Sequence, residues 1–198
     1  MNFQAVLVIA LGAIALYVAL HHLLYYILLR DRKEFLSFAL TCLAIVYYDF
    51  ACARLYLSVT PEGGRLWQVQ QFAALAAAGI FLLMFVSHLI KRASRRWDYI
   101  FTAYWIVQLV LLNVADHSLI CTELPSVKHV MRFGSMMVYY EMQPGILVNI
   151  QTIVGIIALV YILFSLGKAY KPENRNQIMP VRVGMLVFAA GVANDSAV

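Results

Sequence analysis

The feature that most constrains this chain is a succession of long apolar segments separated by short polar connections. These segments lie approximately at 5–29, 35–58, 67–90, 99–115, 146–167 and 181–198. A helix of roughly 20 residues crosses a hydrocarbon core of about 30 Å. Because lipid offers backbone groups no hydrogen-bond partner, each segment should be an α-helix. The sequence therefore predicts an all-α, polytopic membrane helical bundle with six transmembrane helices, forming a single transmembrane domain over residues 1–198.

The composition agrees with a membrane location. Apolar residues make up 63% of the chain and charged residues 13%, whereas soluble domains are roughly half apolar and a quarter charged. The net charge of +5 comes from short basic runs beside apolar segments, where Lys and Arg face lipid headgroups. We therefore expect the lipid bilayer, and no nucleic acid, as a partner. Cys42, Cys52 and Cys121 lack metal-ligand spacing, so no disulfide, metal site or cofactor is expected.

The basic residues are distributed unevenly between alternate connections. Eleven of the fifteen Lys and Arg residues lie in or beside the first, third and fifth connections, at 30–33, 91–96 and 168–182. The second and fourth connections hold only Arg65, Lys128 and Arg132. Because insertion retains Lys and Arg in the cytoplasm, the N-terminus is predicted to lie outside it. The chain should therefore be a multi-pass protein of the inner (plasma) membrane, with its second and fourth connections external.

The longest connection, residues 116–145, falls on the external side in this topology. Residues 132–141 alternate between polar and apolar side chains, a pattern typical of a strand pair. The segment is also rich in Met and Tyr, which would pack over the mouth of the bundle more readily than remain solvated. We therefore predict an external β-hairpin lid.

Polar side chains gather near the external ends of several predicted helices. Ionisable groups in a bilayer cost about 2.5–3.5 kcal/mol, so they usually face the bundle interior. We predict an externally open cavity with aromatic walls. Its ligand-binding residues are Arg54, Tyr48, Trp67, Gln71, Asn113, Asp116, Tyr140, Asn149 and Asp195. The alternative is that an individual Gln or Asn at a span end only reaches toward the headgroups or holds helices together.

Arg54 carries most of this prediction. It follows Asp49 by five residues, which is about 140° around a helix, so the two side chains cannot pair well on one face. Arg54 therefore needs either a carboxylate from another helix, with Asp116 and Asp195 as candidates, or an anionic ligand. The sequence leaves both alternatives open.

Motifs that carry chemistry are missing from the sequence. There is no HExxH, GxSxG or Walker motif, and no carboxylate pair at one depth on one predicted helix. His21, His22 and His88 are interpreted as core or headgroup-facing residues, because adjacent histidines point about 100° apart on a helix. We therefore expect that the chain is not an enzyme.

Three short segments resemble parts of a known family. They are residues 67–71 (WQVQQ), the aromatic and Pro-Gly entry to the fifth segment (Tyr139, Tyr140, 144–147), and residues 191–195 (GVAND). In this order they resemble the N-terminal seven-helix sensory region that precedes bacterial histidine kinase and diguanylate cyclase modules. The resemblance covers most of the chain. It implies a seventh helix that runs into a cytoplasmic kinase or cyclase output domain of the full-length chain, and it leaves a homodimer open.

Topology and resemblance together predict a receptor-type sensory domain. It would bind a small extracytoplasmic or membrane-derived molecule and signal to the output domain by shifting its helices. A small-molecule transporter or carrier is the first alternative, although transporters favour broken helices, repeated halves and binding sites near the bilayer midplane. A membrane scaffold without a ligand is the second.

Overall fold

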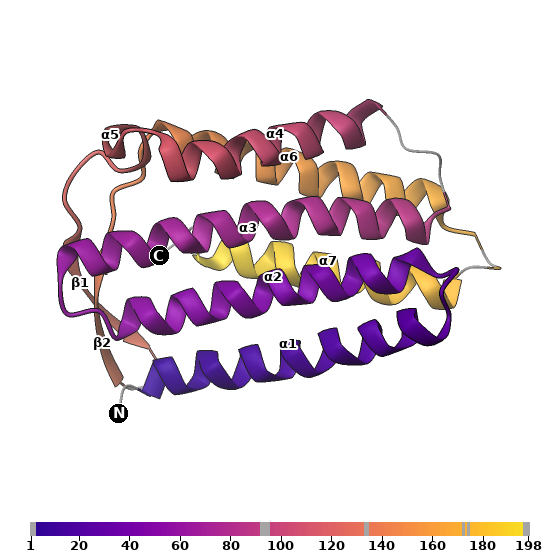
Figure 1. Ribbon diagram of the computed structural model, residues 1–198, viewed down its shortest axis with the longest axis horizontal. Helices are drawn as coiled ribbons and strands as arrows, with labels where there is room; N and C mark the ends of the chain where they lie inside the picture. Colours follow the sequence, from indigo (N-terminus) through magenta and orange to yellow (C-terminus); the bar gives the residue numbers. More distant parts are fainter. Residues whose placement is uncertain (1–2, 92–95, 133–134, 172, 174, 196–198) are drawn as a thin grey trace.

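The computed structural model describes residues 3–91, 96–132, 135–171, 173 and 175–195 of the chain (Figure 1). Within these ranges, the side chains of residues 132, 135, 137 and 187–195 are not described. The long helices are α1 (Phe3–Leu28), α2 (Lys33–Tyr56), α3 (Pro61–Leu89), α4 (Arg96–Val114), α6 (Ile146–Ala169) and α7 (Arg175–Asp195). A short helix, α5 (His117–Ile120), and two strands, β1 (Ser126–Arg132) and β2 (Ser135–Glu141), lie between α4 and α6.

The predicted helical membrane bundle is confirmed at this level. Five helices, α1, α2, α3, α4 and α6, are long and apolar enough to cross a membrane, so the chain is a multi-pass membrane protein. The segment predicted as the sixth span is also helical, but α7 begins earlier than expected, at Arg175. Its first half carries Arg175, Asn176, Gln177 and Arg182. Arg175, Asn176 and Gln177 precede the apolar segment from which this span was predicted.

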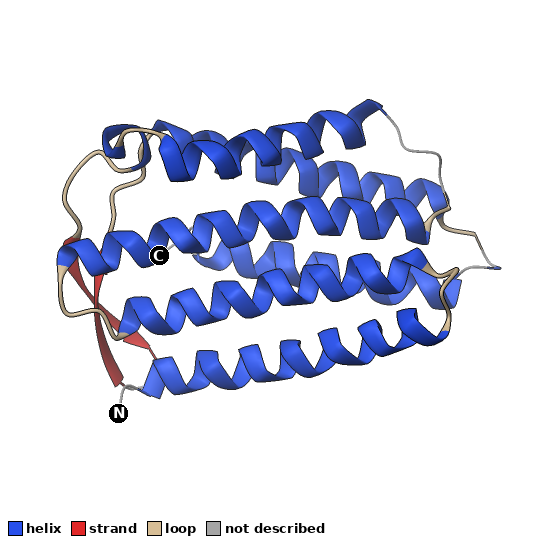
Figure 2. Cartoon of the chain, in the orientation of Figure 1, coloured by secondary structure: helices blue, strands red, loops and turns tan. Residues whose placement is uncertain are grey.

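The helices run side by side along the length of the molecule (Figure 1). Helices α1, α2, α3 and α4 pack successively against their neighbours in the chain, and α6 packs on both α3 and α4. Helix α7 packs on α6, behind α2 and α3 in this view. One end of the bundle carries the hairpin and α5 (Figure 2) and is called the hairpin end. The other, called the basic end, carries Lys33, Lys91 and Lys168.

The connection at the hairpin end is fixed by its own backbone. Cys121 forms an antiparallel bridge with Pro144, and the Gly145 N–H donates to the Ile120 carbonyl over 2.8 Å. A Cβ atom on Gly145 would lie only 2.5 Å from the Leu119 oxygen, so a larger residue cannot occupy this position. The same contact sets where α6 begins.

The hairpin itself is antiparallel, with Ser126 paired to Glu141 and Arg132 paired to Ser135. The predicted segment 132–141 thus supplies the second strand, and the first strand lies earlier in the chain than expected. The Lys128 Nζ and Glu141 Oε2 atoms form an ion pair of 2.9 Å across the strands. A lid function for this hairpin stays a prediction.

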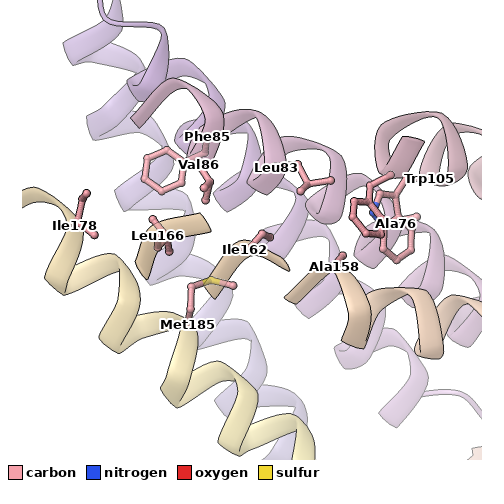
Figure 3. Packing of buried hydrophobic residues seen from close by; sticks show 11 residues of the cluster. Ala76, Leu83, Phe85, Val86, Trp105, Ala158, Ile162, Leu166, Ile178 and Met185 are labelled. Carbon is pink, nitrogen blue, oxygen red and sulfur yellow. The ribbon is translucent and has the colours of Figure 1, made fainter. Parts of the chain in front are cut away.

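Two hydrophobic clusters hold the second half of the bundle together. The larger one joins α3, α4, α6 and α7 through Ala76, Leu83, Phe85, Val86, Phe101, Trp105, Ala158, Ile162, Leu166, Ile178 and Met185 (Figure 3). The smaller one lies at the hairpin end and comprises Leu112, Ile120, Cys121, Met142 and Val148. The larger cluster surrounds the cavity described next.

Candidate functional site

A cavity of about 260 Å³ lies between α3, α6 and α7, with Trp105 of α4 in its wall. We call it the central cavity. Its walls are formed by Phe72, Leu75, Ala78, Gly79, Leu82, Leu83, Trp105, Gln151, Thr152, Gly155, Ile156, Ala158, Leu159, Ile162 and Met185. Figure 3 shows Met185 of α7 extending toward Ile162 of α6, with Trp105 farther along the bundle. Almost all of this wall is hydrocarbon or aromatic ring, which suits an apolar ligand.

The central cavity lies near the middle of each helix that lines it. Trp105 is at the centre of α4, and Met185 is at the centre of α7. Two residues of the rim face the surface of the bundle, since Leu75 is 37% exposed and Ile156 is 53% exposed. In a membrane-spanning protein this surface faces hydrocarbon. Over the described side chains, the cavity is therefore open toward the surface of the bundle.

A chain of buried amides crosses one end of the central cavity. Gln108 of α4 is 2% exposed and Gln151 of α6 is 4% exposed. The Gln108 Nε2 group donates to the Gln151 Oε1 atom and to the Leu147 carbonyl, each over 3.1 Å. The Gln151 Nε2 group donates to the Phe72 carbonyl of α3 over 2.8 Å. This chain ties three helices together and presents Gln151 to the cavity.

Trp105 also lines the central cavity. Its side chain is only 4% exposed, and the indole lies between two glycines that also line the cavity. A Cβ atom on Gly79 would lie 3.0 Å from the indole nitrogen, and one on Gly155 would lie 3.7 Å from the opposite edge of the ring. Among the described residues, the buried Trp105 Nε1–H has no hydrogen-bond acceptor.

Among the described side chains, the residues predicted to form an external cavity make their contacts in separate groups. Arg54 is exposed, and its guanidinium lies 5.0 Å from the centre of the Trp67 ring. The Trp67 ring also packs edge-on against Phe50, with 5.6 Å between the ring centres. Over the described side chains, Arg54 makes no ion pair. This pair lies on the surface that α2 and α3 share.

Tyr48 and Gln71 form a different group, between α2 and α3. The Gln71 Nε2 group donates to the sulfur of Cys52 over 2.9 Å, and the Tyr48 hydroxyl interacts with the same thiol. Cys52 is 6% exposed. These side chains satisfy one another inside a helix interface, which corresponds to the helix-holding alternative of the sequence analysis.

Tyr140 belongs to the packing of the hairpin. Its hydroxyl donates to the Val59 carbonyl over 3.3 Å. A Cβ atom on Gly64 would lie only 2.4 Å from the Tyr140 Cβ atom, so β2 lies directly on the start of α3. Nearby, the Gln68 Oε1 atom accepts a hydrogen bond of 2.6 Å from the Met142 N–H. The hairpin is thus attached to the bundle by side-chain packing and by one buried amide.

The remaining predicted residues lie at helix ends near the hairpin. Asn113 and Asn149 are exposed, and their amide groups donate to Leu109 and Pro144 carbonyls within or beside their own helices. Asp116 accepts from the Ser118 N–H and caps α5. Asp195 is the last residue of α7, and its side chain lies outside the described part of the structure. A role for these residues in ligand binding stays a prediction.

The sequence analysis missed the central cavity together with Gln108 and Trp105. A signal was present, because Gln108 lies in the middle of a predicted span, where an amide needs a partner. No pattern in the amino-acid sequence indicated the cavity itself. It depends on how far α7 lies from α3, and no local pattern specifies that distance.

Fold and cavity together define a multi-pass helical membrane protein with an apolar cavity near the middle of its helices. Comparison with protein-family models, with curated proteins and with solved structures finds no match to this chain. Its function is therefore argued from the site alone.

Proposed function

We propose that this chain is a receptor-type sensory domain that takes up a small molecule from the bilayer into the central cavity. The observation that carries the proposal is the composition of the cavity wall. Helices α3, α4 and α6 form most of it and are cross-linked by the Gln108–Gln151–Phe72 hydrogen bonds. Among the described side chains of α7, Met185 lines the cavity. A molecule that fills the cavity therefore presses a cross-linked wall on one side and a single helix on the other.

The attachment of α7 favours its role as the moving element. Among its described side chains, Ile178 and Met185 are buried, and both belong to the larger cluster. Pro180 lies between them inside the helix, and a proline removes one intrahelical hydrogen bond and eases bending there. Displacing Met185 would tilt α7 about this point. A coupling free energy of about 1–3 kcal/mol between two positions of α7 would give a useful response.

The proposed orientation follows the distribution of basic residues. With α7 as a sixth span, the basic end lies in the cytoplasm and the hairpin end lies outside. The end of α7 that begins at Arg175 then faces the cytoplasm, where a movement can reach a kinase or cyclase output domain. The family resemblance supports this direction of signalling.

A carrier is the second candidate, and the depth of the central cavity favours it, because transporters bind their substrates near the midplane. The form of the helices favours sensing. Helices α3 and α6 run through the cavity region without interruption, whereas carriers commonly break helices at the substrate. Uptake of a probe into protein-containing liposomes above that of empty liposomes would favour the carrier.

The experiment that tests sensing measures the position of α7 with spin labels in lipid nanodiscs. Cysteines replace the exposed residues Gln177 on α7 and Tyr99 on α4, and the three native cysteines are buried, which limits background labelling. Ala158→Leu then mimics an occupied cavity, because Ala158 lines it. We expect the distance between the labels to change by several ångströms.

A second label pair is the control for this measurement. It joins Tyr99 to Leu28, an exposed residue at the end of α1, and Ala158→Leu should leave its distance unchanged. If α7 does not move, or if both pairs move equally, the sensory proposal is wrong.

A further inference from the structure

A second cavity lies at the basic end of the bundle, between the connection from α1 to α2 and the end of α3. We call it the basic-end cavity. Its volume is about 480 Å³, within the range of about 300–1,000 Å³ that small-molecule sites occupy. Its lining is polar and carries charges of both signs. It is formed by Asp31, Arg32, Lys33, Glu34, Ser87, His88 and Lys91.

The two helices that line the basic-end cavity are joined beside it by a hydrogen bond. The Ser37 Oγ atom of α2 lies 3.2 Å from the His88 Nδ1 atom of α3. Ser37 is 1% exposed, and its hydroxyl also donates to the Lys33 carbonyl over 3.1 Å. The start of α2 and the end of α3 are therefore held side by side at this end (Figure 1), which brings Lys33 and Lys91 to one cavity.

The basic-end cavity lies at the depth of the lipid headgroups. Helix α2 begins at Lys33, and α3 ends at Leu89, two residues before Lys91. Both helices are long and apolar enough to cross a membrane, so their ends reach the interface between hydrocarbon and water. Basic cavities between membrane helices at this depth bind lipid headgroups in other proteins. The bilayer is therefore the nearest source of a ligand.

Two lysines of the basic-end cavity favour a phosphate group. Lys33 and Lys91 are exposed, and neither side chain forms an ion pair or a hydrogen bond over the described part of the chain. The third basic residue, Arg32, is already paired with Glu34 over 3.1 Å. Two ammonium groups are therefore available, and phosphate oxygens accept charge-assisted hydrogen bonds from such groups.

Asp31 favours a ligand that also carries a positive charge. It lines the same cavity, is exposed, and has no ion pair or hydrogen bond to its side chain within the described residues. Its carboxylate would repel a phosphate alone, whereas a primary ammonium group offers it up to three N–H donors. We propose that the basic-end cavity binds the headgroup of a phospholipid with a phosphate and a primary amine, as in phosphatidylethanolamine.

The test uses four lipids that differ only in the amine. Phosphatidylethanolamine and its N-methyl, N,N-dimethyl and N,N,N-trimethyl forms share one phosphate and can carry the same acyl chains; the last of them is phosphatidylcholine. The complete chain is delipidated in detergent and titrated with each lipid, and native mass spectrometry counts the lipids bound to each protein. We expect phosphatidylethanolamine to bind about 2- to 10-fold more tightly than phosphatidylcholine, the range of one hydrogen bond. The partly methylated lipids should fall between them.

Substitutions at the cavity separate the two halves of the headgroup. Asp31→Asn removes the partner of the ammonium group, so the preference for phosphatidylethanolamine should disappear. Lys33→Gln combined with Lys91→Gln removes the partners of the phosphate and should weaken all four lipids by the same factor. These side chains are exposed, so the packing of the helices stays intact. Glu173→Gln and Lys168→Gln are matched controls that should change neither quantity, because both residues lie at the basic end outside the lining of this cavity.

Equal binding of phosphatidylethanolamine and phosphatidylcholine would make the proposal wrong. A preference that survives Asp31→Asn, or that Glu173→Gln reduces as much, would also overturn it, because the ammonium group would then bind elsewhere. Tighter binding of phosphatidylglycerol, which has the phosphate without an amine, would show a site for anions alone and would contradict the role of Asp31.

A soluble competitor separates a lipid from a free headgroup. Glycerophosphoethanolamine carries the same phosphate and amine without acyl chains, and at equal concentration it should not displace bound phosphatidylethanolamine. Displacement would remove the lipid as the source of the ligand and overturn the proposal. The basic-end cavity shares no lining residue with the central cavity, so these measurements do not depend on the sensory function.

Discussion

The interfaces that α2 makes with α1 and α3 are built from small side chains, whereas the interface among α3, α4, α6 and α7 is built from large ones. The buried apolar residues of α2 are Ala39, Cys42, Ala44, Ala51, Cys52, Ala53 and Leu55. Those around the central cavity include Phe101, Trp105, Ile162 and Met185. Small side chains let helix backbones approach closely, and this is a common way to pack helices in membranes.

This difference determines where the protein can bind a ligand. Close approach in the first part leaves little space, and Gly12 of α1, for example, would bring a Cβ atom within 3.3 Å of Asp49 on α2. In the second part the indole of Trp105 lies between α3 and α6 and holds the helices apart. The resulting space is bridged by amides at one end and is open to lipid at its rim. Large, rigid side chains and unfilled volume thus occur together.

The largest expected effect comes from one substitution made in both parts. Ala51 in α2 is 0% exposed, and Ala158 in α6 lines the central cavity. Ala51→Leu should lower the free energy of unfolding by about 1–3 kcal/mol, because a closely packed interface cannot accept the added carbons. Ala158→Leu should lower it by no more than about 1 kcal/mol, because the cavity and α7 can yield to the added carbons. Steric trapping in bicelles measures both. Equal losses would remove the contrast between the two parts.

The next effect concerns the amide chain that replaces apolar packing in the second part. Gln151→Leu leaves the buried Gln108 amide with one partner fewer and removes the side-chain donor that bonds the Phe72 carbonyl in addition to its own helix. We expect a loss of about 1–2 kcal/mol in the free energy of unfolding. Asn149→Leu is the control, because Asn149 is exposed and makes only a 3.5 Å bond to Pro144. Gln108→Leu combined with Gln151→Leu should recover part of the loss, and strictly additive losses would contradict the pairing.

The two parts were also unequally predictable from sequence. The helices follow from apolar segments, and most of their observed ends lie within a few residues of the predicted ones. The exceptions are α3 and α7, which begin at Pro61 and Arg175 instead of at 67 and 181, because their polar first turns carry no hydropathy signal. The site was harder to predict, because it depends on which faces of distant segments meet. Arg54 was expected to need a carboxylate or a ligand, and it lies over Trp67, thirteen residues later in the chain.

A smaller effect tests how the hairpin is attached to the closely packed part. Gln68 on α3 is 9% exposed and accepts from the Met142 N–H. Gln68→Leu should lower the free energy of unfolding by about 1 kcal/mol, because a buried backbone N–H loses its acceptor. Hydrogen exchange at Met142 should become faster. Gln70→Leu is the matched control, since Gln70 bonds only the exposed Tyr47 hydroxyl. Faster exchange in both variants would show that the amide bond does not anchor the hairpin.

The smallest effect belongs to Arg54 on the exposed side of α2 and α3. Its guanidinium lies over the Trp67 ring at 5.0 Å, and an exposed cation–π contact of this kind contributes about 0.5–1 kcal/mol. Arg54→Met retains much of the apolar stem, so it should lower the free energy of unfolding by no more than about 1 kcal/mol. In a double-mutant cycle with Trp67→Leu, most of the cost should disappear once the ring is absent.

If Arg54 is instead paired with a carboxylate, its substitution should cause a much larger loss in the free energy of unfolding. A carboxylate paired with a buried Arg54 would be left alone by Arg54→Met, which costs about 3–5 kcal/mol, and Trp67→Leu would not change that cost. Asp116 caps α5 and Asp195 ends α7, so each can be tested by asking whether its own substitution to Asn removes the Arg54 effect. A loss below about 1 kcal/mol in the free energy of unfolding that depends on Trp67, and on neither aspartate, would place Arg54 in the surface packing of α2 and α3. The carboxylate pairing would then be wrong.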